Sequence, residues 1–526
     1  MQEIAVIIIL LAVVTALAEI TDKIRIPYPI LLVLAGIGIG FIPGLPHISL
    51  HPEIVFLVFL PPILYYAAWS TSWPDFKAAK RPITLLAIGC VIFTTCTVAW
   101  IAHTFIPGLG WPGAFVLGAI ISPPDAVAAT AATKGLGLPR RVITVLEGES
   151  LVNDATGLIA YRYAVAAVVS GTFSINQAGI QFVIVAIAGI LLGLVIAVIF
   201  KWIHSITPDN PTNDTTLTFL APYIAYLSAE AIHVSGVLAV VTAGLYLSWN
   251  SSTMFSQQTR LQANGAWNTV IFLLNGIIFI LIGLQLDDVL GNIRGHSPGA
   301  LVMYAGIVSL AVIIGRIVWV YPGTYLPRWV SRKIRRTEPR PNIRLVSVVA
   351  WSGMRGVVSL AAALALPLTI AGGEPFPNRN LIIFLTFAVI FSTLVLQGLT
   401  LGPLITLLGV KPDGSEHEQE QEARLRLAAG IIEHIEEHYA LAVSDEVLNR
   451  IKTKYEIRMQ RIRKVHGGSL DEEQINAFHM IQQELLEKER ADVIRLRNDG
   501  MISDELRRKI EYELDLEEAR LLLERG

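Results

Sequence analysis

The sequence has little charge and only two cysteines. Charged residues make up 16% of its 526 residues and hydrophobic residues 53%, whereas a soluble chain usually carries about 25% charged residues. Cys90 and Cys96 lie in one apolar stretch, so we expect two buried apolar side chains and neither a disulfide framework nor a thiolate metal site. The composition therefore predicts an integral membrane protein.

Several motifs are also missing. The chain contains no P-loop, which argues against a pump that hydrolyses nucleotide, and no HExxH helix, which argues against a membrane-embedded metallohydrolase. Met1-Gln2-Glu3 lacks the basic start of a cleavable signal peptide, so the first hydrophobic run is expected to remain as a helix. We expect a protein that is not an enzyme, binds no cofactor or nucleic acid, and draws its energy from an ion gradient.

Thirteen apolar runs predict an all-α polytopic membrane fold. The runs cover residues 3–21, 28–44, 53–70, 82–106, 112–133, 141–169, 178–203, 215–232, 236–249, 267–286, 299–322, 343–371 and 380–409. Lysine and arginine gather in alternate loops, which in membrane proteins face the cytoplasm. The sequence therefore predicts a multi-pass protein of the cell (inner or plasma) membrane, with its amino terminus outside and its carboxyl terminus inside.

If the seventh of the thirteen runs is a linker, runs 1–6 begin outside the membrane and runs 8–13 begin inside it. The sequence then predicts two six-helix repeats of opposite orientation. Inverted repeats are typical of secondary transporters. Equivalent runs of the two repeats carry helix breakers beside a charge, Pro123 and Pro124 before Asp125, and Gly353 and Gly356 around Arg355. Both helices are therefore expected to be interrupted near the middle of the membrane, although tolerated kinks without ligands are the simpler alternative.

The segment EGESLVNDATG, residues 147–157, places three carboxylates inside an apolar run. A carboxylate at mid-membrane costs at least a few kcal/mol, so its presence there indicates a function. Ser150 and Asp154 are four residues apart and share a helical face. Glu147 and Glu149 differ by about 200° around the helix, so only one of them is expected to face the same cavity.

The side chains of Asp125, Ser150, Asn153 and Asp154 offer oxygen ligands, which suit a small hard cation. Burial favours the protonated form of Asp154, whereas a bound cation stabilises its ionised form, so the two ligands should compete. One proton would then move against one monovalent cation, without net charge. Asn153 matters because a second carboxylate would add a titratable site. A purely structural hydrogen-bonding role for Asp154 is the alternative.

Two other functions remain open at this point. Oxygen ligands do not fix the cation radius, so K+/H+ antiport competes with Na+/H+ antiport. A cation channel lined by the same acidic residues is a rival of another class. Channel currents would exceed carrier turnover by orders of magnitude and would need no countertransported proton.

The sequence resembles the sodium/proton exchangers of the monovalent cation:proton antiporter-1 family over roughly residues 3–409. The motifs that carry the resemblance are Glu149-Ser150-x-x-Asn153-Asp154, Asp125 in a proline-interrupted run, and Gly353-x-Arg355-Gly356. The resemblance implies Na+/H+ antiport (and related Li+ transport) for pH homeostasis, crossed interrupted helices, homodimers and an elevator-like movement. No cofactor is implied beyond the transported Na+ and H+.

The same resemblance assigns roles to individual residues. Asp154 is the implied carrier of the proton and the cation. The remaining implied ligands are Ser150, Asn153, Asp125 through water, and a backbone carbonyl placed at Pro124, with Ser122 and Pro123 left open. Glu149 and Arg355 are the implied buried ion pair. The family often places proline directly after the span-five aspartate, but here Ala126 follows Asp125, which leaves that carbonyl uncertain.

Other charged residues in the apolar runs are given structural roles. Arg162 is expected to neutralise Glu147 or another acid, and Arg316 to pair or to extend to the membrane surface. Glu230 and His233 are expected to form a local pair, with His233 as a packed or capping residue rather than a ligand.

Residues 411–526 are rich in Glu, Arg, Gln and Leu and predict soluble amphipathic helices. Residues 411–414 are the expected linker, Asp499-Gly500 an expected helix stop, and Ser503-Asp504-Glu505 a helix start. His434 and His438 lie one turn apart, and we expect a solvated face rather than a metal site. By position, this tail is predicted to regulate transport or to contact the dimer partner.

Overall fold

A computed structural model describes most of the chain. The described residues are 2–24, 26–42, 52–133, 136–171, 175–207, 210–291, 293, 295, 297–337, 340–370, 373–410, 415–439, 445–464, 472–499, 501 and 504–525. The chain divides into two compact units, a membrane unit (Met1–Asp413) and a C-terminal unit (Gly414–Gly526).

Helices lie in every one of the expected apolar runs of the membrane unit. The first part of the unit contains α1 (Gln2–Ile24), α2 (Tyr28–Gly40), α3 (Pro52–Ile54), the π-helical turn η1 (Val55–Phe59), α4 (Leu60–Ser70), α5 (Trp73–Ala78), α6 (Lys80–Thr84), the π-helical turn η2 (Leu85–Cys90), α7 (Val91–Phe105), α8 (Trp111–Ile121), α9 (Ala126–Thr133) and α10 (Arg140–Ser170). The second part contains α11 (Ile175–Ile206), α12 (Pro211–Ala231), α13 (Gly236–Met254), α14 (Gln257–Gly291), α15 (Pro298–Val330), α16 (Arg332–Thr337), α17 (Ile343–Trp351), α18 (Val357–Leu364) and α19 (Arg379–Leu407). The described residues form no β-strand, only an isolated bridge between Thr369 and Pro375. The all-helical expectation is therefore confirmed, whereas the number of crossings and the repeat symmetry stay predictions.

Six described segments are long and apolar enough to cross a membrane. They are Pro52–Ser70, Lys80–Phe105, Asn176–Ile206, Gln257–Gly291, Pro298–Val330 and Arg379–Leu407. The 31-residue helix α10 is not among them, and its sequence includes Glu147, Glu149, Asp154 and Arg162. These four charged side chains explain why α10 is not among the apolar segments.

Two helices of the membrane unit are broken. Helix α8 ends at Ile121 and α9 begins at Ala126, while α17 ends at Trp351 and α18 begins at Val357. The two breaks touch, because the backbone N–H of Asp125 donates a 2.7 Å hydrogen bond to the carbonyl of Met354. The backbone groups freed by each break therefore meet inside the unit.

The expected helix over residues 343–371 ends early. Helix α18 stops at Leu364, and Pro367 follows within three residues. Proline has no N–H to donate and disfavours helical geometry in the residue before it. The expectation of two buried cysteines is also corrected: Cys90, at the end of η2, is buried, but Cys96 of α7 is exposed.

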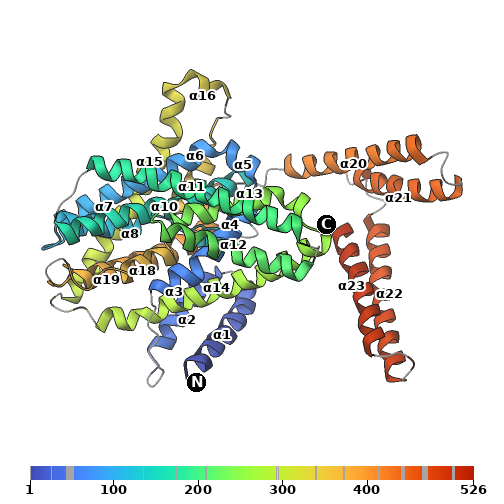
Figure 1. Ribbon diagram of the computed structural model, residues 1–526, viewed down its shortest axis with the longest axis horizontal. Helices are drawn as coiled ribbons and strands as arrows, with labels where there is room; N and C mark the ends of the chain where they lie inside the picture. Colours follow the sequence, from blue (N-terminus) through green and yellow to red (C-terminus); the bar gives the residue numbers. More distant parts are fainter. Residues whose placement is uncertain are drawn as a thin grey trace. The chain divides into compact units, whose positions relative to one another are not determined.

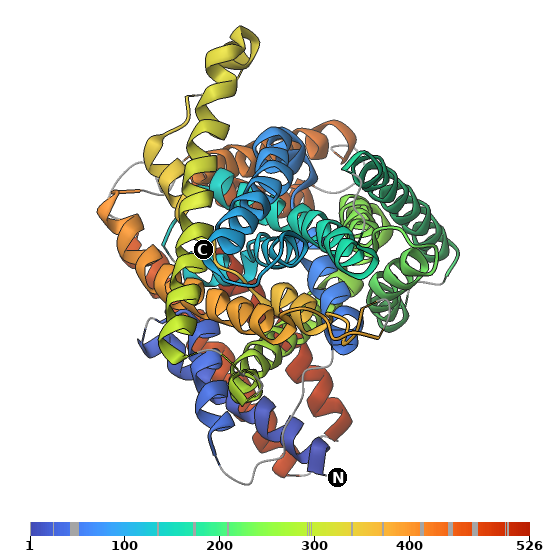
Figure 2. The same ribbon diagram turned by 90° about the vertical axis from the view of Figure 1, so that its left-hand side faces the viewer.

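Helix α10 packs against α7 and α8 (Figure 1). The close packing has a local cause, since a Cβ atom on Gly157 would come 2.9 Å from Cγ of Pro123. The proline ring therefore packs directly on the α10 backbone. The end of α15 and helix α16 project from the bundle in both views (Figures 1 and 2).

The C-terminal unit contains the amphipathic helices that its sequence predicts. They are α20 (Ser415–Tyr439), α21 (Asp445–Lys464), α22 (Glu472–Asn498) and α23 (Asp504–Arg525). Helix α20 packs on α21 and α22 on α23, with Leu486, Val493 and Leu514 in a small apolar core. The expected linker 411–414, Gly500 and Ser503 lie outside the described residues. The rings of His434 and His438 lie with their centroids 4.2 Å apart and their planes tilted by 33°. No group of three metal-ligating side chains occurs among the described residues.

Candidate ion-binding site

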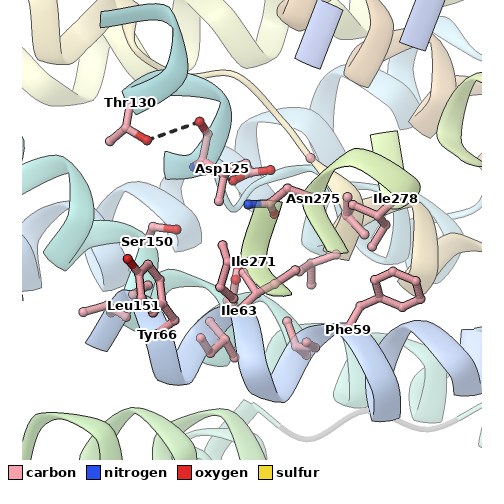
Figure 3. Close-up of a pocket in the computed structure, with 18 of the residues that line it drawn as sticks. Phe59, Ile63, Tyr66, Asp125, Thr130, Ser150, Leu151, Ile271, Asn275 and Ile278 are labelled. Carbon is pink, nitrogen blue, oxygen red and sulfur yellow. Dashed lines mark hydrogen bonds between the residues drawn. The ribbon is translucent and has the colours of Figure 1, made fainter. Parts of the chain in front are cut away.

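A cavity of about 420 Å³ lies beside the two helix breaks. Its polar lining includes Asp125, Glu147, Ser150, Asp154 and Asn275. In Figure 3, Asp125, Ser150 and Asn275 border a common space above the helix that carries Ile63 and Tyr66. The cavity thus lies between the broken helices and α10 on one side and α4 and α14 on the other.

Helix α10 presents one face to this cavity. Glu147, Ser150, Leu151 and Asp154 all line it, as expected for positions i, i+3, i+4 and i+7 of a helix. Asp154 is 8% exposed, and its carboxylate makes no hydrogen bond or ion pair with any described residue. Asp154 is therefore a buried carboxylate with free lone pairs at the edge of a cavity.

Asp125 lies at the start of two half-helices. Its Oδ1 accepts a 2.8 Å hydrogen bond from the N–H of Val127 at the start of α9. Its Oδ2 lies against Gly356, where a Cβ atom would come within 1.7 Å, and Gly356 precedes α18. Helix N-termini carry partial positive charge, so both ends partly offset the negative charge of Asp125. Only glycine leaves room for the carboxylate at position 356.

Asn153 has a different place from the one expected. It is fully buried and does not line the cavity, and its Nδ2 donates a 2.7 Å hydrogen bond to the carbonyl of Pro124. Its Oδ1 is buried without a hydrogen-bond partner. In this structure Asn153 holds the α8 to α9 break against α10 rather than facing the cavity.

The expected pairing of Arg355 with Glu149 is wrong in this structure. The guanidinium of Arg355 donates instead to main-chain carbonyls, with Nε 2.9 Å from the oxygen of Ile121 and Nη2 3.2 Å from that of Ser122, and with Nη1 bonded to Gly353. The carbonyls of Ile121 and Ser122 end α8, and a helix C-terminus carries partial negative charge. The broken helix supplies the counter-charge that was expected from a carboxylate.

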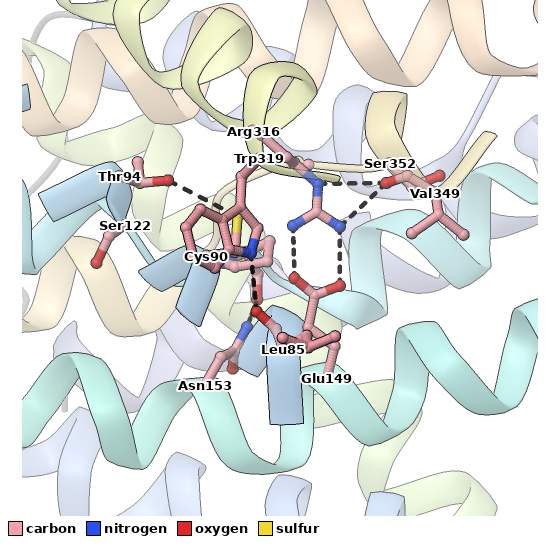
Figure 4. Close-up of polar contacts among 12 residues, drawn as sticks. Leu85, Cys90, Thr94, Ser122, Glu149, Asn153, Arg316, Trp319, Val349 and Ser352 are labelled. Atoms are coloured by element: carbon pink, nitrogen blue, oxygen red, sulfur yellow. Dashed lines mark hydrogen bonds and ion pairs between the residues drawn. The ribbon is translucent and has the colours of Figure 1, made fainter. Parts of the chain in front are cut away.

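Glu149 pairs with Arg316 of α15 instead. The two side chains form a bidentate contact, with Nη1 to Oε1 at 2.5 Å and Nη2 to Oε2 at 2.8 Å (Figure 4). Arg316 also donates to the carbonyl of Val349 near the end of α17, from Nε at 3.3 Å and Nη2 at 3.1 Å. Each interrupted helix thus has an arginine at the C-terminal end of its first half.

Two of the three carbonyls that were candidates for the cation have protein partners. Arg355 donates to the carbonyl of Ser122 and Asn153 to that of Pro124. No side-chain donor among the described residues bonds to the carbonyl of Pro123, and Pro123 lines the cavity. Of the three carbonyls, that of Pro123 is therefore the one without a side-chain donor among the described residues.

The sequence interpretation missed Asn275 as a lining residue. It is 6% exposed and is the one polar side chain in the run from 271 to 284, so an isolated amide in an apolar run was the available signal. Tyr28 and Ser359 also line the cavity.

Arg162 has an acidic partner, as expected, and that partner is Glu230 rather than Glu147. The guanidinium of Arg162 pairs with the carboxylate of Glu230 at 2.7 Å. His233 contacts Glu230 through the backbone, since its N–H donates a 3.0 Å hydrogen bond to the carbonyl of Glu230. His233 is exposed and adopts a positive φ of 58°. Ser235 caps α13, since its side chain accepts from the N–H of Leu238.

Comparisons with known proteins agree with this architecture. The profile of the family described as "Sodium/hydrogen exchanger, transmembrane" matches residues 8–407. An uncharacterized Na+/H+ exchanger of Mycobacterium tuberculosis (strain ATCC 25618 / H37Rv) is 34% identical over 98% of this chain and 96% of its own length. A sodium, potassium, lithium and rubidium/H+ antiporter of Bacillus pumilus (strain SAFR-032) is 34% identical over 89% of this chain and 72% of its own.

A solved structure shows the same fold. The sodium/proton antiporter of Methanocaldococcus jannaschii, determined at pH 8, superposes with a TM-score of 0.62 at 21% identity, over 78% of this chain and 100% of that one.

Proposed function

Because the chain belongs to the sodium/hydrogen exchanger family, we propose that it is an electroneutral secondary antiporter. It exchanges Na+, or Li+, for H+ across the cell membrane by alternating access, and it serves pH homeostasis. The observation that carries the proposal is the carboxylate of Asp154, which borders the cavity and is only 8% exposed. A carboxylate held away from water is stabilised by binding either a proton or a cation, and not by both at once.

The proposed cation site combines oxygens from α10 and from the α8 to α9 break. Asp154 and Ser150 line the cavity from α10, and Asp125 lines it from the break. A backbone carbonyl of Pro123 or Pro124 completes the site, and Asp125 acts through water. Asn153 is a positioning residue here, since its amide bonds to the carbonyl of Pro124.

The charge count of this site favours electroneutral exchange. Asp125 lies at the start of α9 and against Gly356 before α18, where partial positive charges offset its own. Glu149 is neutralised by Arg316. Asp154 is then the group whose charge changes in the cycle, so one H+ replaces one monovalent cation.

K+/H+ antiport is a second candidate that one observation favours. The Bacillus pumilus relative is named as an antiporter of sodium, potassium, lithium and rubidium, and oxygen ligands suit all of these cations. The two candidates share the same carrier residue and differ only in the cation.

The assembly is also a proposal. We infer a homodimer in which α10 and the broken helices move against the remaining helices, which is supported by the position of the cavity between these two sets. The outer face of α11 is rich in exposed apolar side chains, among them Ile184, Leu191 and Trp202. Such a face suits either lipid or a second copy.

Reconstitution tests the proposal. The purified full-length protein is placed in liposomes that contain a pH-sensitive dye, and gradients of Na+, Li+ or K+ are applied in turn. Each transported cation should change the lumenal pH, and clamping the membrane potential at zero should leave the rate unchanged. A rate that follows the membrane potential contradicts electroneutrality, and currents without proton movement would indicate a channel.

A further inference from the structure

A second cavity lies on the basic side of the membrane unit, away from Asp154. It has a volume of about 220 Å³ and lies between α6 with η2, α10, α15 and the start of α17. Three arginines line it, Arg81, Arg141 and Arg340, and no acidic residue of the described chain does. The cavity therefore joins three of the loops in which basic residues predict the cytoplasmic side.

Two of the three arginines that line this cavity carry charge that no described residue neutralises. Arg141 and Arg340 are exposed, and neither makes a hydrogen bond or an ion pair with a described residue. Arg140, the neighbour of Arg141, pairs with Asp75 at 3.0 Å. The nearby carboxylate of Asp75 therefore neutralises Arg140 and not Arg141. Two unpaired guanidinium groups that line one cavity, Arg141 and Arg340, suit the binding of a phosphate.

The rest of the cavity wall is apolar. It includes Leu86, Val145, Trp319, Val346 and Val349. The ring of Trp319 is fixed, because its Nε1 donates a 2.9 Å hydrogen bond to the carbonyl of Leu85 and a Cβ atom on Gly89 would come 2.4 Å from the ring. A soluble phosphate would leave this apolar wall without a contact, whereas a lipid chain would cover it.

We propose that this cavity binds an anionic phospholipid, with its phosphate held by Arg81, Arg141 and Arg340 and the start of an acyl chain packed on Trp319 and Val349. The site lies where membrane-spanning helices reach the basic surface, which is the depth of lipid head groups. Anionic lipids of the cytoplasmic leaflet are attracted by such basic clusters.

Bound lipid would lie next to the buried ion pair. Val349 lines the cavity, and its carbonyl accepts hydrogen bonds from Arg316. Val145 also lines it and is one helical turn before Glu149 on α10. An occupant of the cavity would therefore support the contact of α10 with α15 and α17.

Lipid binding to the purified full-length protein tests the proposal by native mass spectrometry. Dioleoyl phosphatidylglycerol should bind at least several-fold more tightly than dioleoyl phosphatidylcholine with the same chains. Removing each arginine should weaken phosphatidylglycerol binding by about fivefold, and the double variant Arg141→Gln/Arg340→Gln by about 25-fold. Arg335→Gln/Arg336→Gln, two exposed arginines of α16 that do not line the cavity, is the matched control and should bind like the wild type.

Three results would overturn the proposal. They are unchanged phosphatidylglycerol binding by the Arg141→Gln/Arg340→Gln variant, equal binding of phosphatidylcholine, and displacement of the lipid by inorganic phosphate or glycerol 3-phosphate at equal concentration. A second measurement needs no charge variant. Phosphatidylglycerol with brominated chains should quench more fluorescence in the wild type than in Trp319→Phe, and equal quenching of both contradicts the site.

Discussion

Glu149 of α10 and Arg316 of α15, 167 residues apart, meet in a bidentate ion pair whose side chains are only 2% and 1% exposed. Arg316 also donates two hydrogen bonds to the carbonyl of Val349, from Nε and Nη2. The pair therefore ties α10, which carries Asp154, to α15 and to the first half of the second broken helix.

Removing one member of this pair should destabilise the protein strongly. Glu149→Gln leaves the charge of Arg316 buried without a carboxylate, which typically costs about 3–5 kcal/mol. Because Arg316 and not Arg355 is the partner, Glu149→Gln/Arg316→Met should lose less stability than the sum of its single variants. Fluorescence-detected melting of the detergent-solubilised protein compares the stability losses of the two single variants and the double variant.

The control is the exposed pair of Arg162 and Glu230, whose side chains are 46% and 33% exposed. Glu230→Gln should cost no more than about 1 kcal/mol. If Glu149→Gln couples to Arg355→Gln rather than to Arg316→Met, the assigned pair is wrong.

Gly356 should not tolerate a side chain. In Gly356→Ala the new methyl group would lie where Oδ2 of Asp125 lies, within 1.7 Å, and overpacking of this kind costs about 1–3 kcal/mol. We expect a lower melting temperature and a strongly reduced exchange rate in liposomes. Gly306→Ala on α15 meets no atom within 4 Å and should behave as the wild type. Equal activity of the two variants contradicts the close contact of Asp125 with Gly356.

Asn153→Asp should make stability depend on pH. Nδ2 of Asn153 donates to the carbonyl of Pro124, and an aspartate keeps a donor there only when it is protonated. Folding then takes up a proton, so the stability of the variant should fall as the pH rises from about 5 to about 8. Melting temperatures measured across this pH range test the prediction. Asn268→Asp is the control, because Asn268 is exposed and its side chain accepts a hydrogen bond from Tyr66 rather than donating one. A flat pH profile in Asn153→Asp would show that the donor is not needed.

Truncation after Pro412 tests the role of the C-terminal unit. Its four helices form a compact unit of their own, so its removal should leave the membrane unit folded. We expect the pH or cation dependence of exchange to shift, as measured in liposomes. If exchange and dimer stability are both unchanged, the unit has no regulatory or dimer-contacting role.

The sequence predicted those parts of the site that depend on local chemistry. Pro123 and Pro124 cannot donate backbone hydrogen bonds, and the structure has its break there. The helical angle between Glu147 and Glu149 implied different surroundings, and one lines the cavity while the other pairs with Arg316. Each of these features depends on one segment of the chain and not on how separate helices pack.

The partner of Glu149 depends on how separate helices pack and was not predictable from the sequence. Arg316 was one of several charges in apolar runs, and only the rotation of α15 against α10 selects it for Glu149. The use of free carbonyls at Ile121 and Ser122 by Arg355 could have been anticipated, because every helix end leaves such groups.

The central claim, competition of H+ and a metal cation for Asp154, is tested most directly by the pH dependence of Na+ affinity. In proteoliposomes, the apparent KM for Na+ should rise about tenfold for each unit by which the pH falls on the acidic side. Asp154→Asn should abolish exchange, while Asp287→Asn, at an exposed position of α14, should keep it. An apparent KM that is independent of pH, or full exchange by Asp154→Asn, would contradict the mechanism.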